Sequence, residues 1–419
     1  MPLDLKGLVT ARLGENYSLH EKHLNSTLVR VQRIIGFDHV YARAEGAYLY
    51  DLDERDYLDF LSGYSVFNIG RNHPAVQRAL RDVLEMDLPN MVQMDCSLLS
   101  GLLAEALTKR TPKHLDAVFF CNSGTEAVEA AIKMCKSHGH KISADKYEII
   151  ALDDSFHGRT VGALSLTGQP KYRRDFEPLM PGVKFVPRRD DAALEEAFSE
   201  RTCGIFIEGI QGEGGINPIC RRFFQKAREL ADRYDALLVC DEIQSGVGRP
   251  GVHYSYHLHS PVIMPDIMVA AKPVACGLPL GFTVTNERAA ASIAPGMHGT
   301  TFGGGALACR VALEFYEMLD ELLPQINRVG EYFRTELRTL GQKYSFVKEV
   351  RGSGLMIGME LDRPGKQMVT DGMAHGLLFN CTHDTVLRFL PPYILTEKEV
   401  DLAIRGLKKV FQQAKRTKL

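Results

Sequence analysis

Short, continuous apolar runs recur along the middle of the chain and alternate with segments of helical periodicity. Five of these runs lie at residues 117–121, 149–152, 204–208, 236–241 and 267–271. Runs of this length are typical of strands buried on both faces, and their alternation with helices is typical of βαβ units. The pattern predicts an α/β fold built on a mostly parallel sheet wrapped by helices.

The segment before this region has a different pattern. A mixed helix is expected near residues 20–35, and residues 46–60 alternate around an Asp-Glu-Arg-Asp turn, which predicts a β-hairpin. Two amphipathic helices should follow, one from Pro74 and one over residues 96–110.

The segment after residue 307 is different again. Two long helical stretches come first, the second over residues 327–344, and a hairpin over residues 347–361 and a closing helix from Thr396 follow. This order predicts a smaller α+β domain at the C-terminal end.

Composition excludes some classes of protein. The 419 residues include 50 Lys and Arg and 52 Asp and Glu, so the net charge is −2. A protein whose main partner is nucleic acid or an anionic membrane surface needs a clustered excess of basic residues. The small net charge of this chain therefore argues against both kinds of partner. No apolar stretch is long enough to span a membrane, and residues 1–25 lack a signal-like apolar core. The nine cysteines show no CxxC spacing, so we expect reduced thiols in a soluble, cytoplasmic protein.

Two ionisable residues end two of the predicted strands. Asp241 ends the run at 236–241, and Lys272 follows the run at 267–271. Because ligands of open α/β sheets bind at the carboxyl ends of the strands, both side chains should face one crevice. A buried charge needs a partner, so the two residues either serve a ligand, pair with each other, or lie solvated at the strand ends.

Pyridoxal phosphate (PLP) would use both residues. Lys272 would form a Schiff base with its aldehyde, and Asp241 would keep the ring nitrogen protonated so that the ring acts as an electron sink. Ser123, Gly124 and Thr125 lie between a strand and a helix, where backbone amides bind anions. We expect these three residues to hold the phosphate; the alternative is an ordinary helix N-cap.

Six motifs resemble those of the class III (ornithine/acetylornithine-type) aminotransferases, in the family's order and spacing from about residue 46 to about residue 407. They are Asn122-Ser-Gly-Thr-Glu-Ala127, Ser155-Phe-His-Gly-Arg-Thr160, Glu208-Gly-Ile-Gln-Gly-Glu-Gly-Gly215, Asp241-Glu-Ile-Gln244, Ala271-Lys272 and His298-Gly-Thr-Thr-Phe-Gly-Gly304. Each motif alone is a weak signal, whereas six in register are a strong one.

The resemblance implies the architecture of fold type I PLP-dependent transferases, which are aspartate aminotransferase-like, with a seven-stranded sheet. Residues 1–70 would contribute to the small domain, 71–306 would form the large PLP-binding domain, and 307–419 would form the small domain. The family forms homodimers with shared active sites, so Thr301 would reach the phosphate of the neighbouring subunit.

The resemblance also implies roles around the cofactor. Phe156 would cover one face of the ring with His157 beside it, and Gln244 would contact the cofactor's hydroxyl. Tyr64 would line the mouth of the site, although a tyrosine that simply packs is the alternative.

Substrate binding involves three more residues. Arg159 is a planar donor that suits a substrate carboxylate, or else it forms a structural ion pair. A transaminase accepts two substrates in one pocket, and an arginine waiting for the carboxylate of 2-oxoglutarate would be an uncompensated charge in the other half-reaction. By resemblance, Glu208 is the switchable partner of Arg388.

The sequence departs from the family pattern at three places. The usual proline after the motif glutamate is Gly209, the lysine is followed by Pro273, and Ala306 ends the Gly-Gly run. Pro273 should bias Lys272 towards an extended backbone. None of these changes removes a reacting group, but they affect the shape of the loops that choose the substrate.

Two other patterns are weaker. Residues 246–251 match GxGxxG but open no helix, which argues against nucleotide binding. His253, His257 and His259 lack the framework of a metal site.

The sequence therefore predicts a PLP-dependent aminotransferase that moves an amino group from an acetylornithine- or ornithine-like ω-amino donor to 2-oxoglutarate. A diamine donor such as putrescine, another reaction on the same scaffold, and a catalytically inactive relative are the alternatives. A nicotinamide oxidoreductase that uses the GxGxxG loop is the alternative from a different class.

Overall fold

The central sheet of the protein has seven strands. The computed structural model describes residues 3–89 and 96–416. In spatial order, the strands are β4 (Ala117–Cys121), β12 (Gly281–Thr285), β11 (Ile267–Ala270), β10 (Leu237–Asp241), β7 (Thr202–Glu208), β5 (Glu148–Leu152) and β6 (Val183–Val186). Strand β12 runs antiparallel to both of its neighbours, β4 and β11, and the other neighbouring pairs are parallel. The mostly parallel sheet and its five predicted strands are confirmed, whereas β6 and β12 were not predicted.

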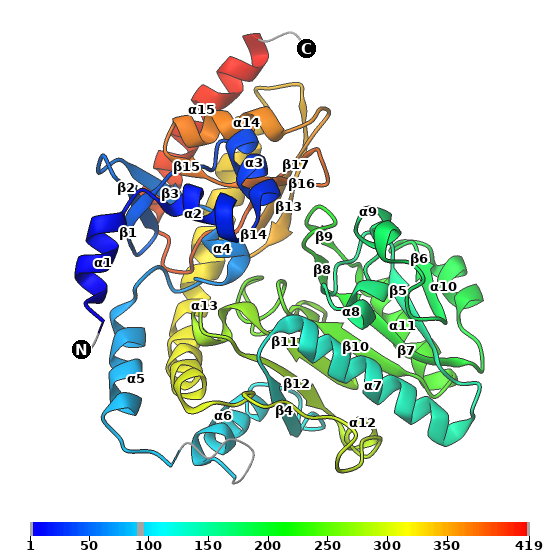
Figure 1. Ribbon diagram of the computed structural model, residues 1–419. Coiled ribbons are helices and arrows are strands. Elements are labelled where there is room, and N and C mark those ends of the chain that lie inside the picture. Colours follow the sequence, from blue (N-terminus) through cyan, green and yellow to red (C-terminus); the bar gives the residue numbers. More distant parts are fainter. Residues whose placement is uncertain (1–2, 90–95, 417–419) are drawn as a thin grey trace.

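Helices cover both faces of this sheet (Figure 1). On one face, Leu237 and Val239 pack in a cluster with residues of α7 (Gly124–Ile142), such as Ala131. On the other face, Leu238 packs in a cluster with residues of α11 (Arg221–Arg233), such as Phe223. Successive side chains of a strand point to opposite faces, so β10 is apolar throughout because both of its faces are covered.

Two smaller sheets lie apart from the central sheet, and one of them contains strands from both the N-terminal and the C-terminal regions (Figure 1). One contains β1 (Tyr41–Glu45), β2 (Tyr48–Asp51), β3 (Asp56–Asp59) and β15 (Leu377–Leu378); the other contains β13 (Val347–Ser353), β14 (Met356–Leu361), β17 (Val386–Phe389) and β16 (Asn380–Thr382). The predicted hairpins are therefore present as β2–β3 and β13–β14. The pairing of β3 with β15 joins N-terminal and C-terminal segments, but the domain boundaries at residues 70 and 306 stay a prediction.

One long helix replaces the two helical stretches predicted after residue 307. Helix α13 (Ala306–Gly341) continues through Pro324. The prediction of two helices was wrong because proline usually ends a helix, whereas here packing against α5, α6, β13 and α15 holds the helix together. Helices α5 (Pro74–Leu84), α6 (Leu98–Thr108) and α15 (Glu397–Arg416) are close to their predicted positions.

The remaining elements are short and mostly join the larger ones. They are α4 (Ser62–Ser65), α8 (Val161–Ser165), α9 (Pro170–Arg173), α10 (Asp191–Ala197), α12 (Glu287–Ala290), α14 (Lys366–Ala374), β8 (Ile210–Gln211), β9 (Asn217–Pro218) and the 3₁₀ turns η1 (Arg174–Phe176), η2 (Ser255–Leu258) and η3 (Lys272–Ala275).

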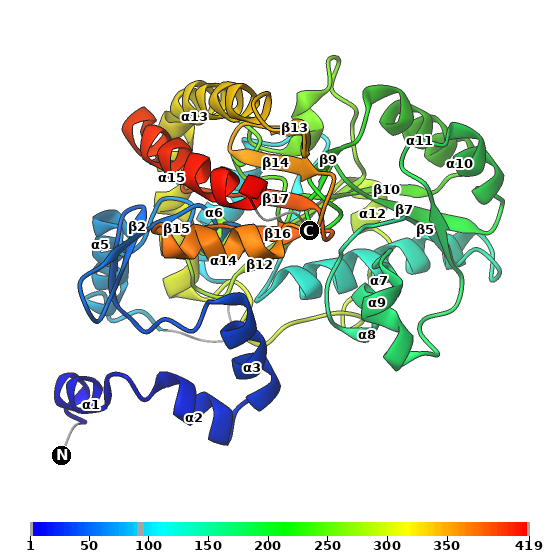
Figure 2. The same cartoon turned by 90° about the horizontal axis from the view of Figure 1, so that it is seen from above.

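The N-terminal segment forms three helices where one was expected near residues 20–35. They are α1 (Leu5–Arg12), α2 (Asn16–His23) and α3 (Ser26–Ile35). Asn25 separates α2 from α3 because its side chain caps the start of α3 by accepting a hydrogen bond from the Leu28 amide. Figure 2 shows α1 and α2 extending away from the rest of the chain.

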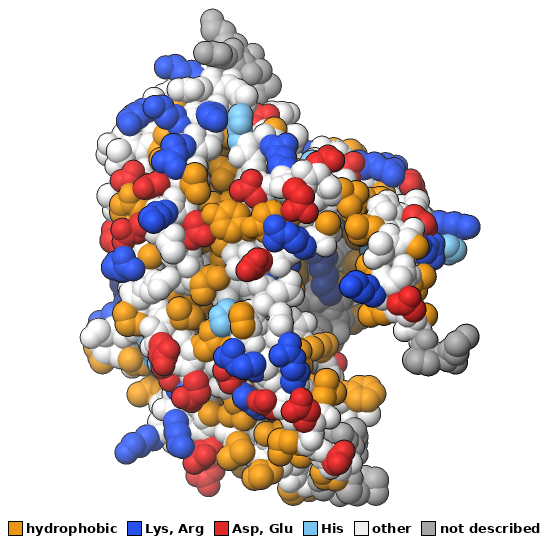
Figure 3. All heavy atoms as spheres, turned by 90° about the vertical axis from the view of Figure 1, so that its left-hand side faces the viewer, with side chains coloured by type: hydrophobic (Ala, Val, Ile, Leu, Met, Phe, Trp, Pro, Cys, Tyr) orange, Lys and Arg blue, Asp and Glu red, His pale blue; other side chains and the backbone are white. Residues whose placement is uncertain are grey.

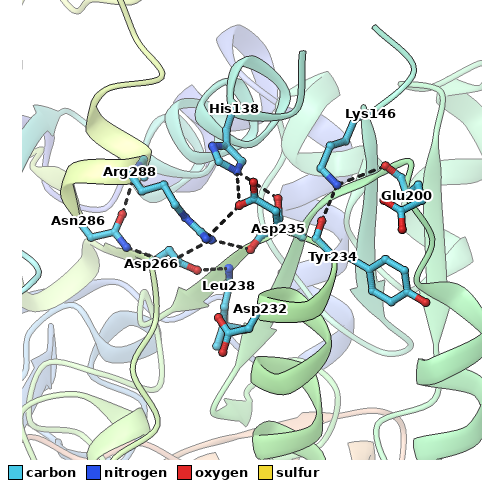
Figure 4. A network of polar contacts seen from close by, with 12 residues as sticks. His138, Lys146, Glu200, Asp232, Tyr234, Asp235, Leu238, Asp266, Asn286 and Arg288 are labelled. Carbon is cyan, nitrogen blue, oxygen red and sulfur yellow. Dashed lines mark hydrogen bonds and ion pairs between the residues drawn. The ribbon is translucent and has the colours of Figure 1, made fainter. Parts of the chain in front are cut away.

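A network of charged side chains lies at the amino edge of β10 and β11 (Figure 4). Asp266 accepts a hydrogen bond from the Leu238 amide at 2.8 Å and pairs with Arg228 at 2.7 Å and Arg288 at 3.4 Å. Buried Lys146 donates to the carbonyl of Tyr234, which ends α11, at 2.6 Å. This cluster fixes the loops between α11, β10 and β11 at the amino edge of the sheet, opposite to the carboxyl ends of the strands.

The face in Figure 3 mixes positive and negative side chains, with apolar side chains between them. This distribution agrees with the small net charge of the chain. Within residues 3–89 and 96–416, no helix combines the length and the apolar character that crossing a membrane requires.

Candidate active site

Asp241 and Lys272 face one cavity at the carboxyl edge of the sheet. Asp241 pairs in register with Val269, so the end of β10 lies beside the end of β11 and the turn that follows it. The cavity has a volume of about 450 Å³. The predicted residues that line it are Ser123, Gly124, Thr125, Phe156, His157, Arg159, Glu208, Asp241, Gln244 and Lys272.

Lys272 has an unusual backbone and a free amine. Its φ is +51°, in the left-handed region, and it opens the turn η3. The expectation that Pro273 would keep Lys272 extended was wrong, since the surrounding structure overrides this local preference at some cost in strain. Among the described residues, no hydrogen bond or ion pair holds the amine. Burial lowers the pKa of Lys272, with Glu213 and Asp241 opposing the shift.

Asp241 is oriented by two donors. His157 Nδ1 lies 2.7 Å from Asp241 Oδ2, and the Ile243 amide donates to Oδ1 at 3.0 Å. Burial alone would lower the pKa of His157, but the hydrogen bond to Asp241 and the charge of Asp241 raise it overall. A carboxylate has further lone pairs, so Asp241 can still accept a hydrogen bond from a ligand in the cavity.

The start of α7 is a capped helix end that borders the cavity. Ser123 is the N-cap, and its hydroxyl accepts a hydrogen bond from the Glu126 amide at 3.4 Å. A side chain at Gly124 would come within 2.8 Å of Ile243. The Thr125 hydroxyl accepts hydrogen bonds from the amides of Arg159 and Thr160, each at 3.3 Å. The N-cap interpretation is confirmed for Ser123, while the phosphate role of these residues stays a prediction.

The partner of Arg388 is Glu213 and not Glu208. Arg388 is fully buried, and its Nη1 lies 2.6 Å from Glu213 Oε1 and 3.2 Å from Gln244 Oε1, while its Nε donates to Asn380 at 3.0 Å. The pairing of Arg388 with Glu208 was therefore wrong. Both glutamates belong to one motif, so the sequence does not show which of them reaches Arg388. The turn after β8 in the structure brings Glu213 to it.

Glu208 instead accepts two backbone hydrogen bonds. They come from the amides of Phe156, at 3.1 Å, and Gly212, at 3.3 Å. Burial raises the pKa of Glu208 to about 7, with the charge of His157 opposing and that of Asp241 adding to the shift.

Arg159 and Phe156 lie beside each other at the cavity. The Arg159 guanidinium lies 5.4 Å from the centre of the Phe156 ring and 4.7 Å from that of Tyr172. In the part of the chain that the structure describes, no ion pair joins Arg159 to a carboxylate. The structure thus gives no support to the alternative of a structural ion pair, and the guanidinium is exposed.

Tyr64 and Thr301 lie outside the cavity lining. Tyr64 is 44% exposed, and its ring centre lies 5.4 Å from the Arg388 guanidinium carbon. Thr301 is exposed on its own chain.

The two weaker sequence patterns have other roles. Residues 246–251 form turns, and the buried Arg249 donates to Ser65, Asn68 and the carbonyls of Leu355 and Pro391. His253 pairs with Asp320 at 2.6 Å. Within residues 3–89 and 96–416, no group of three His, Cys, Asp or Glu side chains could hold a metal ion.

The arrangement fits PLP. The cavity offers a free amine on Lys272, an oriented carboxylate on Asp241, and hydroxyls at a helix start, and these are the groups that an aldehyde, a pyridine nitrogen and a phosphate require. A mostly parallel sheet with a lysine and an aspartate at its carboxyl edge thus defines a PLP-dependent enzyme.

Comparison with known proteins identifies the family. Residues 32–411 match the class-III aminotransferase family, and the chain belongs to this family. It is 40% identical to the acetylornithine aminotransferase of Aquifex aeolicus, over 88% of this chain and 96% of that protein. It is 38% identical to the succinylornithine transaminase of Photorhabdus laumondii, over 86% of this chain and 90% of that protein.

Solved structures agree with this assignment. The ornithine aminotransferase of Toxoplasma gondii superposes with a TM-score of 0.85 at 29% identity, covering 93% of this chain and 96% of that one. A PLP-bound amine transaminase from an uncultivated Pseudomonas species superposes with a TM-score of 0.83 at 27% identity, covering 90% and 95%. The protein is a PLP-dependent aminotransferase, which acts on a small-molecule amino donor and an oxo acid.

Proposed function

We propose that this aminotransferase moves the ω-amino group of an acetylornithine- or ornithine-like donor to 2-oxoglutarate. The observation that carries the proposal is the buried ion pair between Arg388 and Glu213 beside the cavity. A buried arginine with a releasable carboxylate can accept a second carboxylate in one half-reaction and stay neutralised in the other. Relatives named acetylornithine aminotransferase and succinylornithine transaminase support the ω-amino donor.

The cofactor would be held at three points. Ser123, Gly124 and Thr125 would bind its phosphate at the start of α7, with Gln244 at its hydroxyl. Asp241, oriented by His157, would hold a proton on its ring nitrogen. Phe156 would cover one ring face and exclude water from it.

Lys272 would supply the amine that moves protons. Bound PLP supplies an aldehyde that takes up amino groups and a ring that accepts an electron pair. Because burial lowers the pKa of Lys272, its free amine can take a proton from the donor carbon and return it elsewhere. The unpaired state of the amine leaves it available for this role.

Arg159 and Arg388 would bind the carboxylates of the two substrates. Arg388 would release Glu213 when the second carboxylate of 2-oxoglutarate arrives, and would pair with it again when the amino donor is bound. Arg159 would bind the carboxylate of the donor. This need favours an amino acid donor over a bare diamine such as putrescine.

The active protein would be a cytoplasmic homodimer. Thr301 lies outside the cavity of its own chain, which supports a role at the phosphate of the neighbouring subunit. Exposed apolar side chains near it, such as Phe302 at 71% exposure and Leu84 at 74%, support burial against a second copy.

A screen of amine donors tests the proposal. Purified protein with PLP is given 2-oxoglutarate and acetylornithine, ornithine or putrescine, and glutamate is measured. We expect glutamate from the first two donors, more than from putrescine. Carbon dioxide or an isomerised donor without glutamate would point to another reaction on the scaffold, and no half-reaction with any amine would point to an inactive relative.

A further inference from the structure

Glu208 lies between the two functional ends of the cavity. It ends β7, pairs in register with Asp241 of β10, and is buried in the cavity wall. Neighbouring parallel strands are about 4.8 Å apart, so Glu208 is next to the carboxylate that would bind the cofactor ring. Nevertheless, its carboxyl group makes no ion pair among the described residues.

Each hydrogen bond of Glu208 goes to a different functional loop. Its Oε2 accepts from the amide of Phe156, whose neighbour His157 orients Asp241. Its Oε1 accepts from the amide of Gly212, whose neighbour Glu213 pairs with Arg388. One carboxyl group therefore holds both the loop at the ring end of the cavity and the loop at the Arg388 end.

Glu242 is a useful comparison for Glu208, because its carboxyl group binds the backbone of a different segment. It is also buried beside Asp241 and also accepts two backbone hydrogen bonds, from the amides of Ser255 and Tyr256. These amides belong to the turn η2, and Glu242 does not line the cavity. Both glutamates are buried and bind two backbone amides, although Glu242 also accepts a hydrogen bond from the Ser255 hydroxyl at 2.7 Å. Only Glu208 reaches loops that carry site residues.

We propose that Glu208 is a positioning residue that couples the two ends of the active site, fixing the Phe156–His157 loop and the Glu213 loop to one point. This proposal rests on the proposed function, in which Arg388 binds the second carboxylate of the acceptor. It assigns Glu208 a role different from that of a substrate ligand, since its two oxygens are directed to backbone amides.

The test compares Glu208→Gln with Glu213→Gln and Glu242→Gln. The amide of glutamine keeps one acceptor oxygen and places its NH2 group against the other backbone N–H, and repulsion between these two donors should move the side chain away from both loops. Three quantities are measured: hydrogen exchange of peptides covering residues 153–160 and 209–215, the dissociation constant of PLP, and the KM values for donor and acceptor. Should Glu208→Gln not fold, Glu208→Asp, which is too short to reach both amides, takes its place.

We expect Glu208→Gln to change both ends of the site. Exchange should rise in both peptides, PLP should bind about tenfold more weakly, and the ratio of donor KM to acceptor KM should rise about tenfold because a loosened Glu213 competes less for Arg388. Glu213→Gln should change only the KM ratio, and Glu242→Gln should change neither the ratio nor PLP binding.

Two results would overturn the coupling. One is exchange in Glu208→Gln that rises in neither peptide or in only one of them. The other is PLP affinity and a KM ratio no different from those of Glu242→Gln. If the wild-type protein forms no glutamate, the proposed function fails, while hydrogen exchange and PLP affinity still decide the role of Glu208.

Discussion

The two ends of strands β10 and β11 carry buried polar clusters of opposite design. At the amino edge, Asp266 binds Arg228, Arg288 and the backbone of Leu238, so its charge is compensated (Figure 4). At the carboxyl edge, the amine of Lys272 has no partner among the described residues. The same strands are thus stabilised at one end and left reactive at the other.

Both edges contain buried polar atoms without a hydrogen-bond partner among the described residues, and at the amino edge these are Arg228 Nε and Arg288 Nε. His157 Nε2 and Arg388 Nη2 are buried without a hydrogen-bond partner within the described part of the chain. Lys272 has a positive φ as well. Backbone strain and an uncompensated buried amine both cost stability, and Lys272 combines the two, which indicates that the carboxyl edge is built for a ligand. Changes there should reduce activity, and changes at the amino edge should reduce stability.

The largest effect is expected at Lys272. Lys272→Ala should lower glutamate formation by at least about a thousandfold, since the group proposed to move protons is lost. The free energy of unfolding should not fall, because the variant removes a buried amine without a partner. Both quantities are measured on the same preparation, by a coupled assay and by urea titration. A loss of more than about 2 kcal/mol in stability would show that Lys272 supports the fold.

The next largest effect is expected at the opposite edge. Asp266→Ala leaves the Leu238 amide without an acceptor and removes the buried carboxylate partner of Arg228, and it should lower the free energy of unfolding by about 3–5 kcal/mol. Turnover per folded molecule should stay unchanged. Asp232→Asn is the matched control, because Asp232 pairs with Arg228 in the same network but is exposed; it should cost less than about 1 kcal/mol. Equal losses in both variants would contradict the account.

A pH-dependent effect is expected at Glu242. Burial raises its pKa to about 7 although hydrogen bonds from Ser255 oppose the shift. Because this folded pKa lies above the unfolded value of about 4.3, the folded state holds a proton that the unfolded state releases. Glu242 therefore contributes stability at low pH that is lost as the pH rises from about 4.3 to 7.

Glu242→Gln should remove this pH dependence. Relative to the variant, the wild-type protein should lose about 2–3 kcal/mol of stability between pH 4.5 and pH 7.5. Urea titrations of both proteins at the two pH values measure this difference. A difference that stays constant with pH would show that Glu242 is ionised throughout.

The smallest effect is expected at Tyr64. Its ring lies 5.4 Å from the Arg388 guanidinium carbon, and a cation–π contact of this kind contributes about 0.5–1 kcal/mol. Tyr64→Leu should therefore raise the KM for 2-oxoglutarate about two- to fivefold and leave stability unchanged. Steady-state kinetics with varied acceptor concentration measures the change, and a KM equal to that of wild type would exclude the contact.

Much of the fold follows from local patterns in the sequence. The buried strands were predictable because their apolar runs are continuous. That Asp241 and Lys272 face one cavity was predictable because both residues lie at the carboxyl ends of strands. Strand β12 was missed because Gly281 and its threonines interrupt the apolar pattern. Helix α13 was predicted as two helical stretches, the second from residue 327, because local patterns do not show the packing that keeps the helix continuous through Pro324.

The missed parts of the site depend on tertiary contacts. Glu213 lies in a Gly-rich loop without periodicity, and it meets Arg388 from 175 positions away in the chain. Its place in the same motif as Glu208 was the available signal. The positive φ of Lys272 runs against the preference that Pro273 imposes, so no local rule predicts it.

The central claim is that Lys272 is the lysine that bonds to PLP. Protein incubated with PLP is reduced with borohydride, digested, and mapped by mass spectrometry. The account predicts that the added pyridoxyl mass lies on the peptide that contains Lys272 and is absent in Lys272→Ala. Labelling of Lys146, the buried lysine of the amino edge, or of no lysine at all would contradict it.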